Sequence, residues 1–222
     1  MHKKTFLFDF DGVLVDSMQY WSEGMINILR MTKTTYPDDI IKIITPLGDK
    51  GTAEYFRDVY KVDMTIEEMY EQMDAYALPK YRDVITLKNG VFECLQVLNK
   101  NNFSINILTA SPHKRVDPCL KRLGIFNWFD HIWTCDDLNM VKSDVRIYKE
   151  AAKRLECNIS DIIFFDDNII ALQTASKAGM YTIGVYDKTS EDFKEKIKGT
   201  ANQYIYSFND LNFSFNCIKN KE

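Results

Sequence analysis

Residues 8–17, with the sequence FDFDGVLVDS, decide the fold of this chain of 222 residues. They close a short apolar segment, residues 4–10, which predicts a buried strand that is broken at Gly12. Asp9 and Asp11 are spaced i, i+2, so both side chains lie on the same side of an extended chain. Carboxylates held this close repel each other unless a proton or a cation intervenes. Mg²⁺, which prefers a few carboxylates plus phosphate oxygens, would offset that repulsion, and Gly12 would let the backbone approach a ligand closely.

The next segment, residues 16–80, predicts helices and almost no strands. Apolar residues recur there at helical spacing, as Trp21 and Met25 do. Residues 65–68, TIEE, have the form of a capping box, which predicts the start of a further helix. Residues 46–51, PLGDKG, predict a loop between helices because proline and glycine favour turns.

From Leu87 onward, strand and helix patterns alternate. Such alternation predicts a parallel sheet with helices on both faces, and the first strand belongs to the same sheet, since alone it could not bury its faces. We therefore predict an α/β fold with a doubly wound, Rossmann-like core, residues 1–15 and 81–222, and a small all-helical insert after the first strand, residues 16–80. The later strands are predicted at residues 104–109, 131–135, 161–165, 181–186 and 203–206, and the later helices at residues 90–99, 112–123, 143–155 and 168–178.

Acidic residues follow two of the predicted strands. The strand at residues 161–165 runs into Asp166 and Asp167, as the first strand runs into Asp9. Ligands of open parallel sheets bind beyond the carboxyl ends of the strands, so both acidic groups should lie at one edge of the sheet. The pattern therefore indicates a cation site at that edge.

Hydroxyl and basic groups extend this pattern. Thr109 closes the strand at residues 104–109, and Ser111 can cap the following helix, with Pro112 as its first residue. Free backbone N–H groups at that helix start suit a phosphate, and Lys142, just before a predicted helix, could neutralise phosphate oxygens. Taken singly, Thr109 indicates no more than a strand-end hydroxyl and Lys142 no more than a surface charge. Their order along one sheet is what indicates a phosphate site.

The composition argues against several classes of protein. A net charge of −4, with 45% hydrophobic and 27% charged residues, is typical of an ordinary globular protein, and no long basic run indicates a nucleic-acid binder. No segment reaches the roughly 20 apolar residues that a membrane-spanning helix needs. The five cysteines are widely spaced, which favours reduced thiols over disulfides or a zinc site. We expect a cytoplasmic monomer with neither nucleic-acid nor membrane partners.

Together, these motifs resemble the haloacid dehalogenase-like superfamily. The resemblance is to the subgroup with a small helical cap after the first strand, which includes phosphoglycolate phosphatases and β-phosphoglucomutases. It extends from Phe6 to about Leu211 and implies that residues 16–80 form the cap. Four motifs carry the resemblance: Asp9-Phe10-Asp11-Gly12-Val13, Leu108-Thr109-Ala110-Ser111, Lys142, and Phe165-Asp166-Asp167-Asn168.

The resemblance implies a Mg²⁺-dependent phosphatase that acts on a small phosphorylated metabolite. Asp9 would attack phosphorus, and Asp11 would protonate the leaving alkoxide and then deprotonate the water that hydrolyses the aspartyl phosphate. The implied catalytic residues are Asp9, Asp11, Thr109 and Lys142. The implied Mg²⁺ ligands are Asp9, Asp167, the backbone carbonyl of Asp11, and Asp166 either directly or through water. The implied phosphate and substrate contacts are Gly12, Thr109, Ala110, Ser111, Lys142 and, from the cap, Lys50.

Two alternatives remain open at this point. A phosphosugar mutase like β-phosphoglucomutase is one, although residues 47–51, LGDKG, lack the Ser-Arg pair that those mutases carry there. A non-catalytic relative that binds a partner through its cap is the other. Residues 142–146, KSDVR, favour it to some extent, because the subgroup usually has Lys-Pro-x-Pro-Asp at this place.

Overall fold

The computed structural model describes residues 4–211 of the chain. Its centre is a parallel six-stranded sheet with the order β3-β2-β1-β4-β5-β6. From the central β1, the chain builds one side of the sheet through β2 and β3 and then the other side through β4, β5 and β6. The predicted α/β fold with a doubly wound sheet is therefore confirmed. The strands are β1 (Thr5–Phe8), β2 (Ser104–Thr109), β3 (His131–Thr134), β4 (Ile162–Asp166), β5 (Tyr181–Val185) and β6 (Gln203–Ile205).

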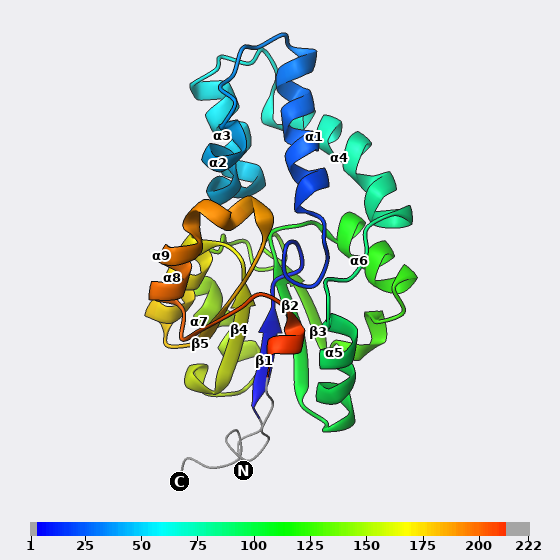
Figure 1. The fold of residues 1–222 in the computed structure, drawn as a ribbon, viewed down its shortest axis with the longest axis vertical. Helices are drawn as coiled ribbons and strands as arrows, with labels where there is room; N and C mark the ends of the chain where they lie inside the picture. Colours follow the sequence, from blue (N-terminus) through cyan, green and yellow to red (C-terminus); the bar gives the residue numbers. More distant parts are fainter. Residues whose placement is uncertain (1–3, 212–222) are drawn as a thin grey trace.

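Helices cover both faces of the sheet (Figure 1). They are α5 (Val91–Lys100), α6 (His113–Arg122), α7 (Val145–Arg154), α8 (Ile169–Ala178) and α9 (Lys194–Thr200). Because side chains alternate along a strand, Phe6 and Phe8 of β1 pack with α5 and α6, whereas Leu7 packs in a second cluster with α7 and α8. All four residues of β1 are buried, as expected for a central strand of a covered parallel sheet.

A group of helices separates β1 from β2 and lies beyond the carboxyl ends of the strands, at the top of Figure 1. These elements are α1 (Met18–Met31), α2 (Ile40–Ile44), the 3₁₀ turn η1 (Thr45–Leu47), α3 (Gly48–Asp58) and α4 (Ile66–Asp83). The last of them extends to Asp83, beyond residue 80, where the insert was expected to end. No described helix is both long enough and apolar enough to cross a membrane.

The loop predicted at residues 46–51 is wrong. Pro46 lies in η1, and α3 begins directly afterwards at Gly48. Further along α3, Ala53 is 1% exposed and Phe56 is 0% exposed. Burial of these two side chains against neighbouring elements stabilises the segment as a helix. Tertiary packing therefore outweighs the turn preference of the proline and the glycines.

Smaller differences concern helix ends. The helix predicted from Ser143 begins at Val145, because the side chain of Asp144 accepts a hydrogen bond from the backbone of Arg146 and caps the helix there. The stop predicted at Gly124 is confirmed, since this residue follows α6 with a φ of +74°. The short helix α9 was not predicted.

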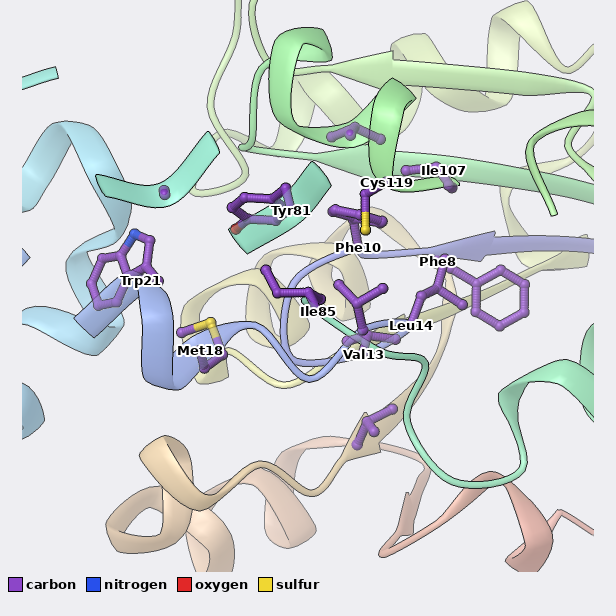
Figure 2. Close-up of a cluster of buried hydrophobic side chains, with 14 of the residues drawn as sticks. Phe8, Phe10, Val13, Leu14, Met18, Trp21, Tyr81, Ile85, Ile107 and Cys119 are labelled. Atoms are coloured by element: carbon purple, nitrogen blue, oxygen red, sulfur yellow. The ribbon is translucent and has the colours of Figure 1, made fainter. Parts of the chain in front are cut away.

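The insert and the sheet share one apolar cluster, which Figure 2 shows in part. Phe10, just after β1, stacks on Tyr81 of α4 with ring centroids 6.1 Å apart. The two chain segments that join the insert to the sheet are also hydrogen-bonded to each other. The backbone N–H of Asp16 donates to Thr86 and that of Lys88 donates to Leu14, both at 3.0 Å. The insert is thus held by burial and by a short antiparallel pairing.

The predicted capping box at the start of α4 is confirmed, and it gives a test of local stability. Thr65 accepts a hydrogen bond from the backbone of Glu68 at 3.1 Å, and Glu68 accepts one from the backbone of Thr65 at 2.7 Å. Thr65→Ala should lower the free energy of unfolding by about 1 kcal/mol, measured by urea denaturation. Thr65→Ser retains the acceptor and should stay close to wild type. Equal stability of the Ala and Ser variants would show that this cap does not stabilise the protein.

Candidate active site

Parallel pairing brings three functional strand ends to one edge of the sheet. Phe8 of β1 lies opposite Ile107 of β2 and Phe165 of β4. The backbone N–H of Asp9 donates to the carbonyl of Phe165 at 2.8 Å, which extends this pairing beyond β1. Asp9 therefore lies between Thr109, the last residue of β2, and Asp166, the last residue of β4.

Asp9, Asp166 and Asp167 form a compact group of carboxylates. One oxygen of each lies within 4.8 Å of the others, as expected of residues that could hold one metal ion. The Nζ of Lys142 lies 2.6 Å from Oδ1 of Asp9 and 2.9 Å from Oδ2 of Asp166. The structure therefore unites four residues predicted from separate motifs.

Burial and charge work against each other at Asp9. Its burial favours the neutral acid and, despite the opposing charge of Lys142, raises the pKa of Asp9 to about 6. The two neighbouring carboxylates have the opposite effect on Lys142 and raise the pKa of its ammonium group, although burial alone would lower it. The lysine therefore stays charged beside the carboxylate that it contacts.

Asp167 is fixed between the backbone of the first motif and a serine. Ser190 donates a hydrogen bond to its Oδ2 at 3.1 Å. On the other side lies Gly12, where an added Cβ would come within 2.8 Å of the Asp167 carboxylate. Burial, followed by the charges of neighbouring carboxylates, raises the pKa of Asp167 well above its ordinary value. A cation near this group would offset both effects.

A partly buried lysine, Lys88, supports the same loop. The Nζ of Lys88 donates to the carbonyls of Gly12 at 2.7 Å and Tyr186 at 2.6 Å, and it forms an ion pair with Asp187 at 3.0 Å. Lys88 thus links the loop after β1 to the loop after β5. No sequence pattern predicts this contact, because Lys88 lies in an irregular segment between two predicted helices.

The carboxylate of Asp11 is not part of the group formed by Asp9, Asp166 and Asp167, and it is held by hydroxyl groups. Ser17 and Tyr81 donate to its Oδ1, and Ser111 donates to its Oδ2, each at 2.6 Å. Burial raises the pKa of Asp11, whereas the three hydrogen bonds oppose this shift by stabilising the carboxylate. The side chain of Asp11 is therefore held in place, two residues after Asp9.

The predicted helix cap at Ser111 is wrong. Pro112 occupies the N-cap position of α6, with no side-chain hydrogen bond, because the hydroxyl of Ser111 is bonded to the carboxylate of Asp11. The backbone N–H of Ser111 donates to the hydroxyl oxygen of Thr109 at 3.0 Å. This leaves the O–H of Thr109 available to donate to a phosphoryl oxygen.

Two predicted contact residues lie outside these interactions. Ala110 is exposed at the end of β2, where its backbone can meet a ligand. Lys50 is exposed in the first turn of α3, and no ion pair or hydrogen bond is found for it within residues 4–211. The structure therefore gives Lys50 no contact with the carboxylate group.

A family comparison covers most of this architecture. The model of the haloacid dehalogenase-like hydrolase family matches residues 6–185, which include all the strand ends described above except that of β6. The chain belongs to the haloacid dehalogenase-like hydrolase family. The resemblance inferred from the motifs is confirmed.

Several relatives of this hydrolase are phosphatases. It is 26% identical over 184 residues to validoxylamine A 7'-phosphate phosphatase of Streptomyces hygroscopicus, covering 82% of this chain and 85% of that one. It is 28% identical over 181 residues to the pyrophosphatase PpaX of Bacillus velezensis, covering 81% of each. The crystal structure of CbbY from Rhodobacter sphaeroides with xylulose 1,5-bisphosphate has a TM-score of 0.82 at 17% identity, over 95% of this chain and 97% of that one. The predicted enzyme class, a phosphatase of this family, is confirmed.

Besides Lys88, sequence reasoning missed three residues of the site. Ser17 and Tyr81 bind Asp11, and Ser190 binds Asp167. Tyr81 is 70 residues from Asp11 in the chain and has the helical spacing of a core residue. Ser17 offered the best signal, since it closes the first-motif stretch.

The tight contact between Gly12 and Asp167 gives a test of this hydrolase. Gly12→Ala should lower phosphatase activity at least about tenfold, because the new Cβ would displace the Asp167 carboxylate. Gly124→Ala is the matched control: its φ of +74° is close to the +70° of Gly12, but nothing lies within 4 Å of the added Cβ. Both variants should lose similar stability to backbone strain.

Phosphate release and urea unfolding would be measured for both variants. Equal activity losses in the two variants would mean that strain, and not the contact with Asp167, controls the site.

Proposed function

We propose that this enzyme is a Mg²⁺-dependent phosphatase that hydrolyses a small phosphorylated metabolite through a phosphoaspartyl intermediate on Asp9. The observation that carries the proposal is the position of Asp9. Its carboxylate lies at the carboxyl end of the central strand, in contact with Lys142 and beside Asp166 and Asp167. The comparisons support phosphatase chemistry, and the metal, the intermediate and the substrate class are our proposals.

The donor set fits a hard divalent cation. The carboxylates of Asp9, Asp166 and Asp167 stand against the single ammonium of Lys142, which leaves an excess of two negative charges in a buried site. Oxygen ligands of this kind suit Mg²⁺. Asp9, Asp167 and the backbone carbonyl of Asp11 would hold the ion. When bound, it would reduce the repulsion between the nucleophile and the phosphate.

Asp166 has a different role in this proposal. Its Oδ2 accepts from Lys142 and its Oδ1 accepts from the backbone of Asn168 at 2.8 Å. Since both oxygens are already engaged, Asp166 primarily orients Lys142. Any contribution of Asp166 to the metal would then be indirect, through water.

In the first step, an oxygen of Asp9 attacks phosphorus and the bond to the leaving oxygen breaks. Lys142 and the O–H of Thr109 hold non-bridging phosphoryl oxygens and stabilise the charge that develops on them. Lys142 is suited to this because it is held in place before substrate arrives. The product of the step is an acyl phosphate on Asp9.

Asp11 handles the protons in both steps. Protonated Asp11 gives its proton to the leaving alkoxide, and the resulting carboxylate then takes a proton from the water that attacks the acyl phosphate. In the structure, Ser17, Tyr81 and Ser111 occupy both of its oxygens. At least one of these hydroxyls must therefore release Asp11 when the leaving oxygen is bound.

We further propose that the helices α1 to α4 act as a cap over this site, with the domain predicted at residues 16–80 extended to Asp83, the end of α4. The link between Tyr81 of α4 and Asp11 supports this, as it joins the insert to the acid. A cytoplasmic monomer remains our proposal. The free thiols of Cys94, Cys119, Cys135 and Cys157 are consistent with a reducing compartment.

Replacement of the nucleophile tests the proposal. Wild type should release phosphate from p-nitrophenyl phosphate with Mg²⁺ and lose this activity when EDTA removes the metal. Asp9→Asn should lower the rate by about a thousandfold or more, because an amide is not a nucleophile. Asp16→Asn, a charge loss at an exposed position of the same loop, should keep the rate. The proposal fails if Asp9→Asn retains wild-type turnover.

Asp11→Asn separates the two chemical steps. Because p-nitrophenolate leaves without a proton, this variant should still form the acyl phosphate but should hydrolyse it slowly. We expect a burst of p-nitrophenolate followed by a slow phase. Borohydride reduction should convert residue 9 to homoserine, detectable by peptide mass. A slow phase without a burst of p-nitrophenolate and without the homoserine label would contradict a covalent intermediate.

The mutase alternative has a separate test. Conversion of a hexose 1-phosphate to the 6-phosphate would support it.

A further inference from the structure

A buried group of charges joins the sheet domain to the insert on the Asp11 side of the site. Its centre is Arg115 of α6, which is only 1% exposed. The Nε of Arg115 donates to Oδ1 of Asp74 in α4 at 2.7 Å, and its Nη1 donates to Oδ2 of Asp49 in α3 at 2.8 Å. One arginine of the core thus contacts two carboxylates of the insert.

The remaining carboxylate oxygens of this group also have partners. The indole N–H of Trp21 donates to Oδ1 of Asp49, and Lys114 pairs with Oδ2 of Asp74. Two acids therefore face two bases, and the group is balanced in charge. Burial disfavours the charge of Arg115, but the nearby carboxylates outweigh this and raise the pKa of its guanidinium.

This group lies next to the residues that hold the proposed acid. Arg115 is one helical turn beyond Ser111, which donates to Asp11. Asp74 is on the same helix as Tyr81, two turns earlier, and Tyr81 also donates to Asp11. Burial, followed by the charge of Asp11, raises the pKa of the Tyr81 hydroxyl, and the charge of Arg115 opposes this shift. Figure 2 shows Trp21 and Tyr81 at this junction.

The leaving group must occupy the same region. In the proposed mechanism, the phosphoryl group is surrounded by Lys142, Thr109 and the carboxylates of Asp9, Asp166 and Asp167. The leaving oxygen lies on the other side, within reach of the Asp11 proton. A leaving group bound at Asp11 would meet the hydroxyls of Ser17 and Tyr81, and the helix that carries Tyr81 also carries Asp74, a partner of Arg115. Among residues 4–211, no lysine or arginine is as deeply buried as Arg115, and its charge is already offset.

We propose that this balanced group selects phosphate esters of uncharged, hydroxyl-rich leaving groups and rejects those that carry a second anionic group. The inference rests on the proposed phosphatase function and names its substrate class. A carboxylate or a second phosphate would have to displace Asp49 or Asp74 from Arg115, which would cost that buried acid its arginine partner. Hydroxyl groups, in contrast, can donate to the free lone pairs of Asp49 without changing any charge.

The test uses pairs of ligands that differ in one carboxylate. Sorbitol 6-phosphate and 6-phosphogluconate, and likewise glycerol 3-phosphate and 3-phosphoglycerate, would compete with p-nitrophenyl phosphate in the presence of Mg²⁺. We expect inhibition constants at least about tenfold lower for the uncharged member of each pair. Equal constants, tighter binding of the anionic member, or no competition by any of the four would overturn the proposal.

Two variants show whether Arg115 is responsible. Asp49→Asn keeps the size of the side chain but leaves one more positive charge on the group, so it should shift the ratio of constants towards the anionic ligand by about tenfold. Glu54→Gln removes the same charge from the same helix, at a position without an ion pair in the described chain, and should not change the ratio. An unchanged ratio in Asp49→Asn would overturn the assignment.

The measured ratio of inhibition constants distinguishes the inference from loss of stability and from failure of the proposed function. A ratio of inhibition constants does not depend on the folded fraction of a preparation, so partial loss of stability in Asp49→Asn would not mimic the effect. If wild type did not hydrolyse p-nitrophenyl phosphate at all, the phosphatase proposal itself would be contradicted. Hydrolysis without charge discrimination would contradict only the present inference.

Discussion

The ammonium group of Lys142 lies between the carboxylates of Asp9 and Asp166, and the site depends on this contact. A buried carboxylate would otherwise take up a proton and lose its nucleophilic form. The backbone of Lys142 is itself held, because Tyr148 of α7 donates its hydroxyl to the Lys142 carbonyl at 3.0 Å. The same hydroxyl contacts the carbonyl of Ala171 in α8 at 3.1 Å. Helices α7 and α8, on one face of the sheet, thus hold the backbone of Lys142 in place at the carboxyl ends of the strands.

Around this contact, the molecule keeps charges buried by giving each a defined neighbour. Lys88 pairs with Asp187, and Arg115 pairs with Asp49 and Asp74. Asp11 and Asp167 differ from these groups, since their hydrogen-bond partners are hydroxyl groups and not cations. Buried charges without a counter-charge are unfavourable in a protein interior, and they are characteristic of functional sites. The buried acids that lack a counter-charge are therefore candidates for function, whereas the ion pairs of Lys88 and Arg115 stabilise the surrounding structure.

Much of the fold and part of the site could be predicted from local sequence. The alternation of strands and helices predicts the parallel sheet, and the sheet in turn brings Asp9, Asp166 and Asp167 together, because each follows or ends a strand. Contacts that depend on packing of the insert could not be predicted in this way. Tyr81 has the spacing of a core residue, and nothing in a helical pattern tells where its hydroxyl points. Asp49 lies in a segment whose sequence predicts a loop, although the segment begins helix α3. The predicted substrate contact was the neighbouring Lys50.

The pairing of the two connecting segments has a consequence for how such a protein can diversify. Because Asp16 bonds to Thr86 and Leu14 bonds to Lys88, the insert leaves and re-enters the sheet domain at neighbouring points. The loop-closure contribution of its length to the free energy of folding grows slowly. The segment between these points can therefore be lengthened, shortened or exchanged while the strand register stays the same. Under the proposed function, the part of the chain that lies against the leaving group could thus change while the residues at the sheet edge are kept.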